Sequence, residues 1–172
     1  MRKLGKMIIM LIILAVLLWG AINVIGARIP RERTFVRTAS MAQSAETVWD
    51  VIIDIERHPD WQKSLKTLEV LSREGNTVRY RSTMKEGFVL EMEEIIYPDR
   101  KQVISTIVNK DLPFGGSWDI TVMSAAGGSE VTLKSDGYVD SKFWRFMLKY
   151  VLGESYWCDL FLTELQARVK AQ

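Results

Sequence analysis

The sequence contains only one cysteine, Cys158, and one histidine, His58, among its 172 residues. A single cysteine excludes an internal disulfide framework and any cysteine-rich zinc module. A single histidine excludes metal centres built on several histidines and leaves a catalytic triad one candidate base. The sequence also lacks a P-loop, a GxGxxG fingerprint, a nucleophile elbow and metal-ligand spacing. We therefore expect neither a metal ion nor another cofactor.

Charged residues are absent between Lys6 and Arg28, where nearly every residue is aliphatic. A helix of about 20 residues, rising ~1.5 Å per residue, spans the ~30 Å hydrocarbon core of a bilayer. We predict a basic tail over residues 1–6, a transmembrane anchor over residues 7–27 and a basic linker over residues 28–33. A cleaved secretory signal is the alternative, since residues 24–27 resemble a cleavage site. The apolar region of such a signal is usually only ~7–15 residues long.

The charge balance changes after this linker. From Thr34 onward there are 17 Lys and Arg against 20 Asp and Glu, a net charge of −3. A basic surface is the electrostatic footprint of nucleic-acid binding, so we expect no nucleic-acid partner. Basic residues flank both ends of the apolar run in nearly equal number, and the positive-inside rule hardly separates the two orientations. We expect a single-pass membrane protein, with only a slight preference for a domain outside the cytoplasm, and the oligomeric state stays open.

Two hydrophobic periods divide the rest of the chain. Residues 34–40 are a plausible first strand, and Ser44 is expected to cap the helix that follows. Alternation across residues 65–139 predicts about six antiparallel strands with one covered face. From about residue 141 to residue 169 the period returns to 3.6, which predicts a long helix with a bend at Gly153. This order predicts an α+β fold in which a curved antiparallel sheet wraps around the C-terminal helix and leaves a cavity between them.

Four short segments carry a resemblance to a known family. They are AETVWDVIID at residues 45–54, HPDW at 58–61, GGSW at 115–118 and EVTL at 130–133, followed by the final helix. Their order and spacing make this part of the chain resemble the START-like (SRPBCC) superfamily, specifically its polyketide cyclase/dehydrase group. The resemblance implies a helix-grip fold over residues 34–172, with a pocket for a hydrophobic ligand between sheet and helix. The superfamily includes lipid carriers, hormone receptors, coenzyme Q-binding proteins, chaperone-ATPase activators and a minority of aromatic cyclases.

Nine residues are candidates for lining this pocket if the predicted strand phases are correct: Trp61, Tyr80, Phe88, Met92, Glu94, Trp118, Met147, Tyr150 and Val151. Ordinary core packing is the alternative for each of them. Glu94 is the candidate for polar recognition or chemistry, because it points inward and a buried carboxylate must be paired or have a raised pKa. His58, in a turn beside Pro59, is expected on the solvated surface rather than as a general base.

The resemblance and the apolar candidates favour a binding or carrier protein, anchored in the membrane, for a lipid, an isoprenoid or a polyketide-like molecule. Two alternatives stay open. An aromatic cyclase or dehydratase needs an inward acid or base, for which Glu94 and Tyr80 are the candidates. A membrane-tethered protein-interaction module needs an exposed apolar patch instead of a cavity. If the domain makes a second contact with the membrane, the candidate is the aromatic stripe expected on the last helix: Phe143, Phe146, Tyr150, Trp157 and Phe161.

Overall fold

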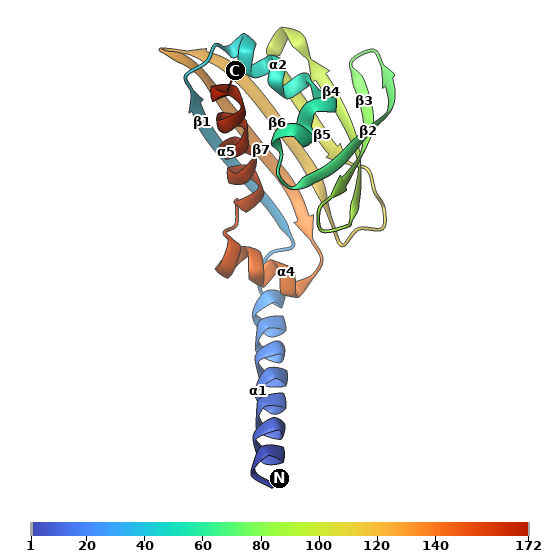
Figure 1. Cartoon of the computed structure of the whole chain (residues 1–172), viewed down its shortest axis with the longest axis vertical. Coiled ribbons are helices and arrows are strands. Elements are labelled where there is room, and N and C mark those ends of the chain that lie inside the picture. The colour runs from blue at the N-terminus through green and yellow to red at the C-terminus, as the bar shows by residue number, and fades with distance from the viewer. Residues whose placement is uncertain (1, 172) are drawn as a thin grey trace. The chain divides into compact units, whose positions relative to one another are not determined.

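The computed structural model describes residues 2–171, and Met1 of the predicted basic tail lies outside the described residues. The chain forms two compact units, whose elements are labelled in Figure 1. The larger unit contains Glu32–Tyr138 and the residues from Ser155 onward. The smaller unit contains the residues up to Arg31 and Val139–Glu154.

A seven-stranded sheet in the order β1-β7-β6-β5-β4-β3-β2 forms the larger unit. Its strands are β1 (Glu32–Met41), β2 (Leu65–Glu74), β3 (Thr77–Met84), β4 (Val89–Tyr97), β5 (Gln102–Ile107), β6 (Phe114–Ala125) and β7 (Gly128–Val139). β1 pairs antiparallel with β7, and β2 to β6 pair antiparallel in sequence order. Burial alternates along the strands, with Val78, Tyr80 and Met92 buried and Arg79 exposed. The predicted inward phase of β3 and β4 is confirmed.

Short helices and one longer helix complete the larger unit: α2 (Ala45–Ile53), a 3-10 turn η1 (Ile55–Arg57), α3 (His58–Trp61), a 3-10 turn η2 (Pro98–Arg100) and α5 (Tyr156–Lys170). Ser44 caps α2 as predicted, because its side chain accepts a hydrogen bond of 3.2 Å from the backbone N–H of Thr47. The buried apolar residues of α5 recur every three or four positions and are Cys158, Leu162, Leu165 and Val169. They join one core with α2 and the inner face of β7, as the helix-grip prediction requires.

The bend predicted at Gly153 is a complete break. The segment before it consists of α4 (Lys142–Met147) and a π-helical turn η3 (Leu148–Leu152), and α5 begins only at Tyr156. Gly153 has a φ of 102°, a conformation that glycine adopts readily and that a right-handed helix cannot contain. The expected aromatic stripe is therefore divided, with Phe143, Phe146 and Tyr150 in the smaller unit and Trp157 and Phe161 in the larger one.

The smaller unit is built on α1 (Arg2–Ala27), which is long and apolar enough to cross a membrane from Leu4 to Ala27. α4 packs against the carboxyl end of this helix. The ring of Phe143 stacks on Trp19 with 5.4 Å between centroids. A Cβ atom at Gly26 would overlap the backbone carbonyl of Lys142, so glycine permits the two backbones to approach. Arg145 donates a hydrogen bond of 2.8 Å from Nη1 to the carbonyl of Ile29.

Candidate functional site

The register of β3 to β6 puts two rows of side chains across the inner face of the sheet. The first row is Val78, Glu94, Ser105 and Trp118, and the second is Tyr80, Met92 and Ile107. Side chains directly opposite each other on neighbouring strands lie ~4.5–5.5 Å apart at Cβ, so each row is a line of contacts. We refer to these seven residues as the inner-face site.

A buried carboxylate is the polar centre of the inner-face site. Glu94 is 2% exposed, and its Oε2 accepts hydrogen bonds from Ser105 Oγ at 2.6 Å and from Tyr80 Oη at 3.3 Å. Its other oxygen, Oε1, is buried and has no hydrogen-bond partner among the described residues. Buried polar atoms are nearly always hydrogen-bonded, so the free Oε1 is an unsatisfied hydrogen-bonding position in the core.

Burial dominates the electrostatics of this cluster. It raises the pKa of Glu94 above the ordinary value, and the two hydrogen bonds from Ser105 and Tyr80 oppose that rise only in part. The pKa of Tyr80 lies well above its usual range, chiefly because of burial and then because the Glu94 carboxylate repels a phenolate. The arrangement therefore holds a phenol proton firmly and favours a protonated Glu94.

Apolar side chains surround this polar centre. Ile55 of η1 is fully buried against Val78, Tyr80 and Met92. Partly buried residues extend the same cluster outward: Leu68, Val70, Leu90, Ile96, Ile107 and Trp118. Phe88 lies immediately before β4, and its ring meets that of Phe114 edge to face with 6.0 Å between ring centroids. The inner-face site is thus one carboxyl group in a wall of aliphatic and aromatic side chains, a composition typical of small-molecule sites.

The other predicted lining residues lie elsewhere. Trp61 is 8% exposed and packs edge to face on the rings of His58 and Phe161, so it joins α3 to α5. Met147, Tyr150 and Val151 belong to the smaller unit, where Tyr150 and Val151 are 57% and 59% exposed. Their role in a pocket stays a prediction.

The expectation that His58 is a solvated surface residue is wrong. The side chain is 6% exposed, and its Nε2 lies 2.9 Å from the carbonyl oxygen of Ile52. Pro59 does not produce an open turn; it stands in the first turn of α3, which folds the histidine back under α2. Burial lowers the pKa of His58, so the neutral ring that donates to this carbonyl is favoured.

Ser105 is the member of the Glu94 cluster that the sequence did not identify. Its position between Val103 and Ile107 places it on the inward face of β5, which alternation alone could have indicated. The pairing of Glu94 with Ser105 depends on the β4–β5 register, which the sequence does not specify.

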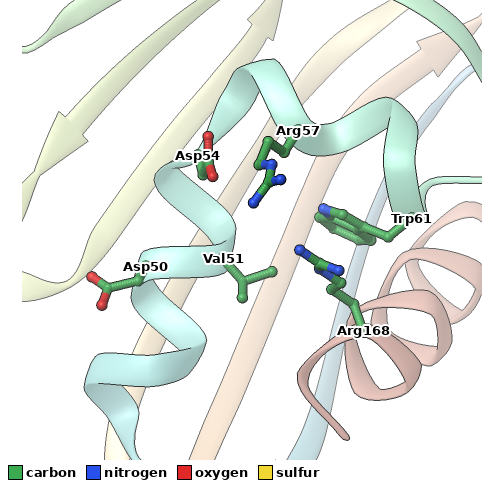
Figure 2. Close-up of a pocket in the computed structure, with 6 residues that line it drawn as sticks. All are labelled: Asp50, Val51, Asp54, Arg57, Trp61 and Arg168. Atoms are coloured by element: carbon green, nitrogen blue, oxygen red, sulfur yellow. The ribbon is translucent and has the colours of Figure 1, made fainter. Parts of the chain in front are cut away.

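Two of the clefts among the described residues are lined by residues outside the inner-face site. One, of about 110 Å³, lies among α2, α3 and α5 and is lined by Asp50, Val51, Asp54, Arg57, Trp61 and Arg168. Figure 2 shows the guanidinium groups of Arg57 and Arg168 on either side of the Trp61 ring edge, with Asp50 directed away from them. The other, of about 320 Å³, lies on the outer face of the sheet and is lined by Ser72, Glu74, Thr77, Arg79 and Glu93. Charged and polar side chains predominate in both, which suits an apolar ligand poorly.

Comparisons with solved structures identify the fold. The Zhui aromatase/cyclase of a Streptomyces species is similar with a TM-score of 0.72 at 15% identity, over 81% of this chain and 94% of that one. A START superfamily protein from Mycobacterium smegmatis has a TM-score of 0.62 at 19% identity, over 83% and 99%. Norcoclaurine synthase from Thalictrum flavum has a TM-score of 0.63 at 14% identity, over 81% and 95%. At these identities the likeness is one of fold alone.

Sequence comparison places the chain in a family. A Streptomyces cyaneus protein provisionally named a polyketide cyclase is 44% identical over 45 residues, which is 26% of this chain and 30% of that relative. The family model described as polyketide cyclase / dehydrase and lipid transport matches residues 41–154, a stretch that includes every residue of the inner-face site. The chain therefore belongs to the polyketide cyclase/dehydrase and lipid transport family, and its fold is similar to that of a START superfamily protein.

Proposed function

We propose that this chain is a membrane-anchored binding or carrier protein for a hydrophobic small molecule with one polar group. The membership of its family supports ligand binding or a cyclase/dehydrase type of function, and α1 has the length and composition of an anchor. A lipid, an isoprenoid or a polyketide-like compound has the required chemistry.

The observation that carries the proposal is the free Oε1 of Glu94 within the apolar wall. An entirely apolar core needs no carboxyl group, and leaving one of its oxygens unpaired costs ~1–3 kcal/mol. A ligand hydroxyl or carbonyl at Oε1 would satisfy that oxygen, while the ligand's apolar body would contact Met92, Ile107 and Trp118. In this role Ser105 and Tyr80 are positioning residues, because they hold Oε2 and thereby direct Oε1.

Native mass spectrometry of the full chain, extracted in a mild nonionic detergent, tests the proposal. We expect a bound apolar molecule that organic solvent releases, with occupancy falling at least several-fold in Glu94→Ala. The matched control is Glu93→Ala, the neighbour on the outer face of the same strand, which should retain the ligand. A chain that carries no ligand and takes up no fluorescent fatty acid or isoprenoid analogue would refute it.

A cyclase or dehydratase is the second candidate, favoured by the raised pKa of Glu94, because burial lets this carboxyl group keep a transferable proton to a higher pH than an exposed one. Glu94→Gln separates the two. The amide keeps the shape and a hydrogen-bonding group at the position of Oε1, so a carrier should still bind ligand. It cannot transfer the proton, so an enzyme should lose turnover of a poly-β-ketone substrate while binding persists.

A further inference from the structure

The segment from Lys142 to Leu152 has an unusual surface for a soluble domain. Four of its large side chains are exposed: Trp144 by 50%, Tyr150 by 57%, Val151 by 59% and Leu152 by 39%. Between Ser141 and Gly153 there are three basic residues, Lys142, Arg145 and Lys149, and no acidic one. An apolar and aromatic surface with basic side chains is the composition of a helix that lies in the membrane interface.

The contacts inside the smaller unit fix the depth of this segment along α1. The apolar run from Met7 to Ile25 is ~28 Å long, close to the ~30 Å hydrocarbon thickness. Trp19 then lies ~9 Å inside the carboxyl end of that run. Phe143 shares this depth because its ring stacks on Trp19, whereas Lys142 lies beside Gly26 at the end of the run.

From these two observations we infer that residues 142–152 form a second membrane contact, immersed in the interfacial layer of an anionic bilayer at the carboxyl end of α1. The inference rests on the proposed anchoring by α1. Aromatic rings are favoured at this level of a membrane, and each nearby cation is attracted by anionic headgroups. The net charge of −3 from Thr34 onward makes the local excess of three cations stand out. The bilayer is thus the partner that fits both the apolar side chains and the charge.

Spin-label accessibility in the full chain tests this inference. The chain, with Cys158→Ala, is reconstituted into vesicles of equal parts phosphatidylcholine and phosphatidylglycerol and labelled at single cysteines. Val151→Cys reports on the segment, Val16→Cys on α1 and Lys66→Cys on the exposed edge strand β2. We expect the ratio of oxygen to nickel-complex collisions to be several-fold higher at positions 151 and 16 than at position 66.

Each outcome of the spin-label experiment either supports or overturns the second membrane contact. A lipid-immersed label at position 16 with a water-exposed label at position 151 would overturn the second contact and leave the anchor standing. A water-exposed label at position 16 would overturn both. A label at position 151 shielded from both reagents would mean that protein, such as a second copy, covers the segment, and would also overturn the inference.

Charge reversal gives an independent readout. Lys142→Glu with Lys149→Glu should reduce the immersion of a label at position 151 and remove its increase with phosphatidylglycerol content. The matched control, Lys66→Glu with Lys85→Glu, changes the same charge on the larger unit and should leave the label's accessibility unchanged. Equal effects of the two pairs would contradict a local headgroup contact.

Discussion

Replacing Glu94 with glutamine should make the protein more stable at neutral and alkaline pH. The carboxyl group is 2% exposed, and its Oε2 is held by Ser105 and Tyr80. The glutamine side chain would keep the volume of Glu94 and present one oxygen to the same two donors. What the substitution removes is the negative charge, which is the form that burial disfavours.

The size of the effect follows from proton linkage. Burial raises the folded-state pKa of Glu94 above the ordinary value of 4.5. Between these two pKa values the unfolded chain has lost the proton that the folded chain still holds. The free energy of unfolding therefore falls by ~1.4 kcal/mol per pH unit as the pH rises through this window. The stabilisation from the protonated group is complete below pH 4.5 and is lost above the raised pKa, where the dependence becomes flat.

Thermal unfolding of wild type and Glu94→Gln in detergent, followed by near-UV circular dichroism from acid to alkaline pH, measures this difference. Within the window each pH unit should widen the gap in Tm by ~3–6 °C for a chain of this size. Glu93→Gln is the baseline, because Glu93 lies on the outer face and pairs with Arg79 at 2.6 Å; losing this exposed pair costs ~0–1 kcal/mol. A Tm difference that does not change with pH, or a less stable Glu94→Gln at alkaline pH, would refute the reasoning.

Three further perturbations have defined outcomes. Gly26→Val should push α4 away from α1, because its Cβ overlaps the Lys142 carbonyl, and should speed tryptic cleavage within residues 139–154; Gly20→Val, with open space around it, should not. The His58 ring should titrate by NMR below pH 6.5, and since its pKa is lowered, stability should fall as acid protonates the unfolded chain first. Met92→Trp should cost little stability but block ligand uptake if its side chain borders a pocket; overpacking a filled core costs ~1–3 kcal/mol instead.

The strands of the sheet could be predicted in detail because the pattern that indicates them, the alternation of apolar and polar residues, lies within each strand. Alternation along β3 and β4 fixed which side chains are inward, so Tyr80, Met92 and Glu94 were identified with the correct phase. Pairing across strands has no comparable local signal. Ser105 could therefore be assigned to the site only from the observed register, which places it opposite Glu94.

Helical periodicity was less informative at the carboxyl end of the chain. A stripe of apolar residues shows that one face of a helix is covered, but it does not show what covers it. Cys158, Leu162, Leu165 and Val169 pack in the core of the larger unit. Phe143 packs instead on Trp19 of α1. The prediction that His58 is exposed was wrong for a related reason. A residue beside proline is exposed only if the following turn leads away from the core. Here α3 leads back to it, and the ring meets Trp61.

The pH dependence of the stability difference between wild type and Glu94→Gln also reports on the ligand. A buried carboxyl group that lowers stability when ionised is explained better by binding than by folding, and perturbed groups of this kind gather at functional sites. A ligand that donates a hydroxyl hydrogen to Oε1 stabilises the carboxylate and lowers the pKa of Glu94, so the pH window of the Glu94→Gln difference should narrow when ligand is added. A ligand carbonyl accepts a hydrogen bond from a protonated Oε1, stabilises the protonated form of Glu94 and widens the window. Repeating the melts with a long-chain alcohol and a matched long-chain ketone distinguishes these cases. An unchanged window with both bound would mean that no ligand reaches Oε1.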